Sequence, residues 1–236
     1  MKKKKIYLSN LSWNQKNTLK VLNKIKKYNL DGIDIAPLKI SKNWSNIEKK
    51  VKKFYKILKS HNLKVNAVQG IFYKTNLNVF ENSKDNFKNI FHHVKLIFKI
   101  FKITKCHKII IGSSDFRNPK NISNKQADLI FYFFLKKAHK YLRKEKIYFC
   151  LEAIPIQYGE KYLYDINHLI KIVKKVKSPW IKINLDTSIF HFKRLDMKQI
   201  NKNANLIKNI QITESNFDYL ENISKNNKLF LNKIKT

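Results

Sequence analysis

Ile147-Tyr-Phe-Cys-Leu-Glu-Ala-Ile-Pro155 and Ile181-Lys-Ile-Asn-Leu-Asp-Thr187 each carry a short apolar run that ends at an acidic residue, Glu152 in the first and Asp186 in the second. Parallel α/β barrels place their catalytic residues at the carboxyl ends of such strands. A buried carboxylate is costly unless it is paired, hydrogen-bonded or bound to a metal ion. The two stretches therefore predict a shared metal ion or a proton-transfer pair at one end of a parallel sheet.

The remainder of the chain alternates strand-like runs with amphipathic helices. The expected strands lie at residues 6–8, 32–37, 65–68, 109–112, 147–152, 181–186 and 209–213. Apolar residues that recur every three or four positions predict helices over about 16–28, 44–58, 84–101, 124–142, 166–176 and 197–207. Strands separated by helices pair in parallel through right-handed crossovers, so the predicted fold class is α/β, a TIM (β/α) barrel.

The predicted organisation is a single domain over residues 1–236, since α/β barrels of about this length form one domain. Residues 216–236 are polar and lysine-rich, with a weak apolar cluster at 229–231. We therefore expect the eighth strand and helix to be missing and the barrel to be truncated at its C-terminal end to about seven strand–helix units. The open edges of the first and last strands would expose unpaired backbone groups, which predicts self-association, as in a homo-oligomer.

The net charge of +34 comes almost entirely from lysine, because the only arginines are Arg117, Arg143 and Arg194. The lysines fall on nearly every predicted helix instead of one stripe. A nucleic-acid footprint consists of a clustered patch, so this distribution favours solvated helix faces and argues against nucleic acid as a partner.

The two cysteines, Cys106 and Cys150, lie beside or within apolar runs and are too few for a disulfide framework. The basic start of the chain lacks an apolar stretch of signal-peptide length, and no apolar segment reaches transmembrane length. These features predict a soluble cytoplasmic protein with no membrane partner.

The residues at the predicted strand ends resemble those of a known family. The segments fall in the family's order at successive strand ends over residues 6–217: Ser9-Asn-Leu-Ser-Trp13, Gly32-Ile-Asp-Ile-Ala-Pro-Leu-Lys39, Ala67-Val-Gln-Gly70, Gly112-Ser113 with Arg117, Leu151-Glu-Ala-Ile-Pro-Ile-Gln-Tyr-Gly159, Leu185-Asp-Thr187 and Ile210-Gln-Ile-Thr-Glu-Ser-Asn216. The chain thus resembles sugar phosphate isomerase/epimerase proteins of the xylose isomerase-like TIM-barrel superfamily, and it is also similar to the ketose 3-epimerases of that group.

This resemblance implies a divalent metal ion, manganese, magnesium, cobalt or zinc, and a sugar or sugar phosphate substrate. Glu152 matches the strand-five glutamate that both ligates the metal and moves a proton beside the sugar carbonyl, and Asp186 matches the strand-six ligand. The strand-seven histidine is replaced by Gln211, whose neutral oxygen is a weaker ligand than imidazole. The strand-eight acid is not found. We therefore expect a metal-assisted isomerase or epimerase with weak or absent activity.

The substrate-contact candidates each have a second interpretation. Gln69 binds substrate hydroxyls or satisfies backbone groups, and Arg117 pairs a substrate phosphate or makes no specific contact. Tyr158 touches substrate or shapes the loop after strand five. His191 follows Asp186 closely but not at the family's histidine position, which holds Ile189 here, and Glu214 is retained from the strand-seven motif.

Glu152 and Asp186 have structural alternatives too, a salt bridge to a lysine at the barrel mouth and a helix N-cap respectively. Two further functions stay open beside the isomerase hypothesis. A nuclease of the apurinic-site endonuclease type shares the barrel, but its metal cluster needs histidines that this sequence lacks at the ends of strands two, three and seven. A catalytically inactive or sugar-binding remnant of the fold is the other alternative, so the sequence leaves open whether the chain is an enzyme.

Overall fold

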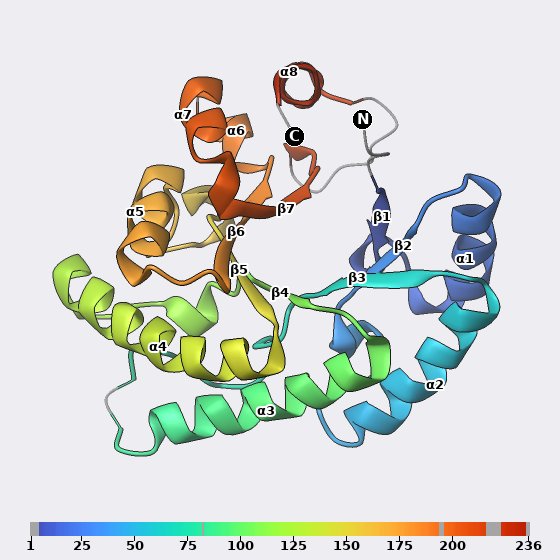
Figure 1. The fold of residues 1–236 in the computed structure, drawn as a ribbon, viewed down its shortest axis with the longest axis horizontal. Coiled ribbons are helices and arrows are strands. Elements are labelled where there is room, and N and C mark those ends of the chain that lie inside the picture. The colour runs from blue at the N-terminus through green and yellow to red at the C-terminus, as the bar shows by residue number, and fades with distance from the viewer. Residues whose placement is uncertain (1–4, 82, 194–195, 216–222, 235–236) are drawn as a thin grey trace.

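The computed structural model describes residues 5–81, 83–193, 196–215 and 223–234. Its centre is a single parallel sheet of seven strands, each hydrogen-bonded to the next in chain order. The strands are β1 (Tyr7–Ser9), β2 (Gly32–Ile35), β3 (Lys64–Val68), β4 (Lys108–Ile111), β5 (Tyr148–Glu152), β6 (Ile181–Asp186) and β7 (Ile207–Gln211). The sheet curls strongly, so that β7 approaches the side where β1 lies (Figure 1).

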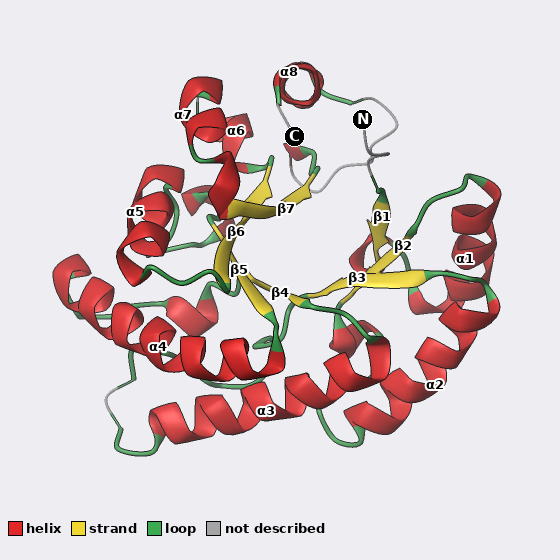
Figure 2. Ribbon diagram, in the orientation of Figure 1, coloured by secondary structure: helices red, strands yellow, loops and turns green. Residues whose placement is uncertain are grey.

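Helices cover the outer side of the curled sheet, which Figure 2 shows as a yellow inner wall behind red helices. They are α1 (Thr18–Lys27), α2 (Ile47–Ser60), α3 (Asn86–Thr104), α4 (Asn124–Glu145), α5 (Ile166–Val176), α6 (Ile189–Phe192), α7 (Met197–Lys202) and α8 (Lys225–Lys233). The seven strand–helix repeats confirm the predicted TIM-type (β/α) architecture. β1 and β7 are the edges of the sheet among the described residues, and association of copies through these edges stays a prediction.

Local sequence signals explain where the longest helix begins and ends. α4 starts with a capping box, because the Ser123 hydroxyl accepts the amide hydrogen of Gln126 while the Gln126 side chain accepts from the amide of Ser123. It ends at Glu145, and the next residue, Lys146, adopts the left-handed conformation that closes many helices. Its buried side chains, among them Ala127, Phe131 and Ala138, recur on one face and press it against the sheet.

The strands separate an apolar outer face from a polar inner face. Ile109, Ile111, Phe149 and Leu151 alternate along β4 and β5 and belong to the main core under the helices. Because successive strand residues point to opposite faces, the residues between them line the inside of the curl. On β5, β6 and β7 these inner residues include Cys150, Glu152, Asn184, Asp186, Asn209 and Gln211. The inner face is therefore where polar chemistry can be placed.

The end of α7 differs from the sequence prediction of one helix over 197–207. α7 stops at Lys202, and β7 begins at Ile207 instead of residue 209. The cause is Asn203, whose side-chain amide donates to the carbonyl oxygen of Gln199 at 2.8 Å and so satisfies a helix-end acceptor locally. Asparagine favours such local bonds over continued helix.

The structure adds a helix, α8, in the C-terminal stretch where the sequence predicted none. Ser224 caps it by accepting the amide hydrogen of Asn227, and Phe230 is buried and stacked on Phe190 of α6, with ring centroids 5.8 Å apart. Of the three apolar residues at 229–231, only Phe230 packs inward, whereas Leu229 and Leu231 are exposed. The segment therefore lacks the apolar period by which a helix is predicted from sequence. The predicted absence of an eighth strand concerns a segment that includes residues 216–222, which lie outside the described residues.

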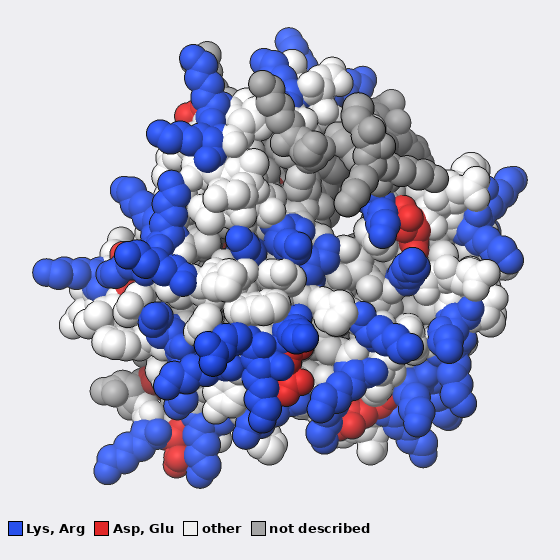
Figure 3. Space-filling view, viewed as in Figure 1, with Lys and Arg blue, Asp and Glu red and all other residues white. Residues whose placement is uncertain are grey.

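On the part of the face in Figure 3 that is not grey, lysine and arginine side chains are scattered across several helices and do not gather in one groove. None of the helices in the described ranges has the length and apolarity needed to cross a membrane.

Candidate functional site

The carboxyl ends of β5, β6 and β7 bring the two predicted acids onto the inner face of the sheet. Glu152 is the last residue of β5 and lies beside Asn184 of β6 in the strand register. Asp186 is the last residue of β6 and lies beside Gln211, the last residue of β7. Asn184 and Asp186 are two positions apart on one strand, so their side chains share a face. The register alone therefore collects four polar side chains at one edge.

Glu152 sits in a place that is shaped for its carboxylate. Its Oε2 atom accepts a hydrogen bond of 2.9 Å from Nδ2 of Asn184. On the other side lies Gly112, directly after β4, where an added Cβ would come within 2.8 Å of Oε2 and 3.0 Å of the carboxyl carbon. A side chain at position 112 would therefore displace the carboxylate. Glycine leaves the room that the carboxylate occupies.

The environment of Glu152 raises its pKa from 4.5 to about 8. Burial in the barrel mouth is the main cause, since it disfavours the charged form, and the nearby charge of Asp186 adds to the effect. The hydrogen bond from Asn184 and the charge of Arg117 oppose the rise without cancelling it. Glu152 therefore changes its protonation state close to neutral pH.

Asp186 is held by the chain around it. Its Oδ1 atom accepts the backbone amide hydrogen of Ser188 at 2.7 Å, and Oδ2 accepts the hydroxyl of Thr213 at 2.9 Å. Burial raises the pKa of Asp186, and the hydrogen bonds from Ser188 and Thr213 limit the rise. The carboxylate thus organises the turn before α6, whose N-cap is Ser188, while its charge acts on Glu152.

A chain of side-chain amides links the remaining strand ends. Gln211 accepts a hydrogen bond of 2.6 Å from Nδ2 of Asn184 through its Oε1 atom and donates through Nε2 to Oε1 of Gln69 at 2.9 Å. Gln69, which follows β3, donates in turn to the hydroxyl of Ser9 at the end of β1. We call Ser9, Gln69, Glu152, Asn184 and Gln211 the mouth network. It unites three predicted site residues, Gln69, Glu152 and Gln211, from distant parts of the sequence.

The structure places Arg117 in a fully buried ion pair. Its guanidinium donates to Oε2 of Glu160 at 2.8 and 2.6 Å, and both side chains have no solvent-exposed surface. Glu160 also accepts from the backbone amides of Tyr162 and Leu163. A buried charge requires such pairing, so Arg117 forms a structural ion pair with Glu160, and its contact with a substrate phosphate stays a prediction.

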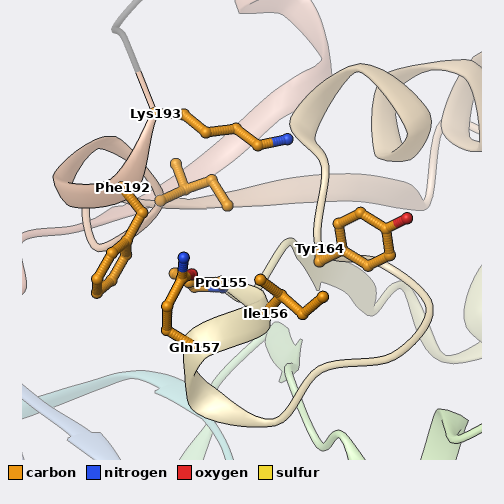
Figure 4. Close-up of a pocket in the computed structure, with 7 residues that line it drawn as sticks. Pro155, Ile156, Gln157, Tyr164, Phe192 and Lys193 are labelled. Carbon is orange, nitrogen blue, oxygen red and sulfur yellow. The ribbon is translucent and has the colours of Figure 1, made fainter.

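Tyr158 lies in a short 3-10 turn, Ile156–Tyr158, where its ring meets Phe192 of α6 edge-on at 5.5 Å. Figure 4 shows the small pocket beside this contact, between the β5 loop and α6. Its lining residues are Pro155, Ile156, Gln157, Tyr164, Ile189, Phe192 and Lys193. None of them belongs to the mouth network. Tyr158 thus packs the loop after β5 against α6, and its contact with substrate stays a prediction.

His191 and Glu214 lie on the β7 side of the mouth. They contact the chain after β7 and the start of α8, respectively. A ring nitrogen of His191 is 2.8 Å from the carbonyl oxygen of Thr213. Glu214 is buried and accepts from the side chain of Asn227 at 2.8 Å and from the amide of Ser224 at 3.0 Å. Burial acts to raise the pKa of Glu214, but the bonds from Asn227 and Ser224 outweigh it and the pKa is lowered. Glu214 therefore anchors the start of α8.

Sequence reasoning missed Asn184, and it named Gly112 in a strand-end segment without finding that this glycine accommodates Glu152. Asn184 interrupts an apolar run two positions before Asp186, and the two-residue period of a strand places both on the same face. That signal was available in the sequence. The role of Gly112 was not, because it depends on the close approach of a side chain from the neighbouring strand.

Comparisons with known proteins agree with the fold of a curled parallel sheet covered by helices. The family model described as "Xylose isomerase-like TIM barrel" matches residues 22–225. The chain belongs to this xylose isomerase-like family. The resemblance drawn from the strand-end motifs is thereby confirmed. No curated protein sequence matches the chain.

Solved structures of this fold superpose on most of the chain. An AP endonuclease, family 2, from Brucella melitensis is similar with a TM-score of 0.76 and 16% identity, covering 97% of this chain and 86% of that one. A D-psicose 3-epimerase, solved in the presence of D-fructose, is similar with a TM-score of 0.75 and 14% identity, covering 97% and 81%. The IolI protein, solved with a zinc atom, is similar with a TM-score of 0.68 and 12% identity, covering 92% and 74%. At these identities the likeness shows the fold alone.

The side chains of the mouth do not fit the divalent metal that the family resemblance implied. The described part of the chain contains no group of three or more histidine, cysteine, aspartate or glutamate side chains that could hold an ion. The amide oxygen of Gln211 and Oε2 of Glu152 both already accept hydrogen bonds from Asn184. The expectation that Glu152, Asp186 and Gln211 together ligate a metal thus conflicts with the hydrogen bonding of the mouth network.

Proposed function

We propose that the chain is an isomerase- or epimerase-type protein that moves a proton beside the carbonyl group of a sugar or sugar phosphate, with Glu152 as the general acid and base. The observation that carries the proposal is the position of Glu152 at the barrel mouth together with its pKa of about 8. A proton-transfer group works best when its pKa lies near the operating pH. Glu152 meets this condition, with the charge of Asp186 contributing to its raised pKa.

The mouth network supplies hydrogen-bonding groups suited to a carbohydrate. The side-chain amides of Gln69, Asn184 and Gln211 each contain a donor and an acceptor, which matches the hydroxyl and carbonyl groups of a sugar. Proton removal beside a carbonyl builds negative charge on the carbonyl oxygen, and amide N–H groups aimed at that oxygen stabilise it. A sugar bound here would exchange hydrogen bonds with these amides next to the Glu152 carboxylate.

The proposal includes slow or incomplete epimerisation. Inverting a carbon requires acid/base groups on both of its faces, and the second carboxylate, Asp186, is committed to Ser188 and Thr213. Glu152 therefore removes and returns a proton on one face. Exchange of that proton with solvent is expected to outpace net conversion of the sugar.

Deuterium exchange tests the proposal directly. The purified full chain is incubated in D2O with D-fructose, D-psicose, D-tagatose and ketose phosphates, and incorporation at the carbon beside the carbonyl is followed by NMR. Exchange that depends on the protein and is lost in Glu152→Gln is the expected result. Glu81→Gln is the matched control. Glu81 is exposed, and its replacement removes the same negative charge at a position away from the mouth. Equal exchange in the wild type and in Glu152→Gln would refute the role of Glu152.

The same experiment separates the alternatives. Saturable sugar binding without exchange would favour a sugar-binding remnant of the fold. The nuclease hypothesis gains no support from the site, because the described residues bring together no cluster of histidine and acidic ligands. Cleavage of abasic-site DNA by the wild type, lost in Glu152→Gln, would revive it.

A further inference from the structure

We propose that the side-chain amide of Asn184 takes the place of a cation at the barrel mouth, so that the site of this chain operates without a divalent metal. The two oxygens that a cation would share, Oε2 of Glu152 and Oε1 of Gln211, lie 2.9 and 2.6 Å from one atom, Nδ2 of Asn184. A primary amide nitrogen has two hydrogens to donate. Both are used here, one for each oxygen.

The position of this nitrogen is incompatible with an ion bound to the same oxygens. Divalent metals sit at about 2.0–2.6 Å from their oxygen ligands. An ion that bridged Glu152 and Gln211 would therefore have to displace Nδ2 of Asn184 from the space between them. Like an ion, the Asn184 amide attracts the oxygens of Glu152 and Gln211, although more weakly. It thereby holds both side chains in place.

A second chain of hydrogen bonds fixes which end of the Asn184 amide faces the mouth. Its Oδ1 atom accepts from Nδ2 of Asn209 at 2.8 Å. Oδ1 of Asn209 in turn accepts from Nζ of Lys108 at 2.9 Å and from Nδ2 of Asn66 at 3.2 Å. A lysine ammonium donates hydrogen bonds and cannot accept them. Lys108 therefore orients Asn209, and Asn209 orients Asn184.

Turning the Asn184 amide to offer its oxygen to a metal would break this order. Nδ2 of Asn184 would then face Nδ2 of Asn209, and both are hydrogen-bond donors. If the Asn209 amide turned as well, its Nδ2 atom would face the donor nitrogens of Lys108 and Asn66. Either rearrangement leaves buried polar groups without hydrogen-bond partners, which is unfavourable. The polar interior of the sheet thus selects the donor end of Asn184 for the mouth.

The inference concerns the same site as the proposed function, but it rests on these bonds and its test needs no substrate. The metal-stripped full chain is titrated with Mn²⁺ and Co²⁺ by calorimetry, and Co²⁺ binding is also followed by absorption spectroscopy. We expect the wild type and Glu152→Gln to give the same result, with no ion bound at the mouth. Residues 216–222 lie outside the described part of the chain. Because the titration uses the full wild-type chain, it also detects any metal binding to which these residues contribute.

Asn184→Asp is the gain-of-binding variant, because it replaces the donor nitrogen by an oxygen without changing the size of the side chain. We expect it to bind Co²⁺ at least about tenfold more tightly than the wild type, since the number of charged oxygen ligands sets affinity for divalent ions. Asn205→Asp, an exposed position, is the matched control and should bind like the wild type. The gain should disappear in the double variant Asn184→Asp with Glu152→Gln.

Two outcomes would overturn the inference. One is a wild type that binds one ion per chain and loses it in Glu152→Gln. The other is a folded Asn184→Asp variant that binds no more tightly than the wild type. If Asn184→Asp does not fold, the comparison of the wild type with Glu152→Gln decides the question alone. Deuterium exchange without metal dependence would leave both proposals standing, whereas metal binding with Glu152-dependent exchange would refute only this one.

Discussion

Replacing Glu152 by glutamine should make the protein more stable at alkaline pH and leave its stability at acidic pH almost unchanged. The folded-state pKa of Glu152 is about 8, above its ordinary value of 4.5. Below pH 4.5 the carboxyl group is protonated in both the folded and the unfolded chain, so its ionisation does not lower the stability. Between pH 4.5 and 8 the unfolded chain ionises while the folded chain keeps its proton, so stability is lost as pH rises. Above pH 8 the loss is complete.

The size of the effect follows from the same two pKa values. One pKa unit corresponds to about 1.36 kcal/mol, so the difference sets a ceiling of about 5 kcal/mol. The side chain is only partly buried and its titration depends on Asp186. We therefore expect Glu152→Gln to gain on the order of 1–3 kcal/mol at pH 8–9. Glutamine keeps an oxygen that can accept the hydrogen bond from Asn184.

Urea denaturation at pH 5, 6, 7, 8 and 9, followed by circular dichroism, measures the difference between variant and wild type. The difference should grow with pH, while Glu81→Gln, an exposed position, should stay within about 0.5 kcal/mol of the wild type throughout. A difference that is independent of pH, or a Glu152→Gln variant that is less stable at pH 8–9, would refute the assignment of a raised pKa to this carboxyl group.

Three further predictions concern the supports of the site. Arg117→Met should destabilise the fold by about 3–5 kcal/mol in urea, because it leaves the buried Glu160 carboxylate unpaired; replacing both residues by apolar ones should cost less, and an equal or greater cost for the pair would contradict this. Gly112→Ala should slow deuterium exchange at the sugar and cost about 1–3 kcal/mol, because its Cβ meets the Glu152 carboxylate; unchanged exchange would count against the crowding. Phe230→Ala should accelerate amide hydrogen exchange in α8 more than in α1 to α5, as its ring fills the contact under that helix; uniform acceleration would show that α8 is not a separate unit.

Much of the fold could be predicted because its signals are local. The apolar period of α4 and its Ser123 cap are written within a few neighbouring residues, and each buried strand is a short apolar run. The boundaries that were wrong depended on side-chain contacts that the apolar period does not show. The end of α7 depends on the side chain of Asn203, and α8 depends on one phenylalanine that packs on α6.

The candidate site was predicted in part for the same reason. Glu152 and Gln69 stand at strand ends, and the order of strands in a parallel barrel brings such ends together. The ion pair of Arg117 could not be predicted, because its partner, Glu160, lies 43 residues away and nothing in the local sequence joins them. Asn184 was overlooked although it shares a strand face with Asp186. An asparagine within an apolar run shows that a polar group is buried, but the run does not show which residues it contacts.

The amino-acid sequence by itself determined the parallel (β/α) architecture, the family and the acids at the ends of the fifth and sixth strands, because helix and strand periods and strand-end residues are properties of short segments. Only the tertiary structure decided what those acids do. The pKa of Glu152 and the direction of the Asn184 amide arise from burial and from hydrogen bonds among β4, β6 and β7. Such effects depend on distances across the sheet, which exist only after residues far apart in the chain have been brought together.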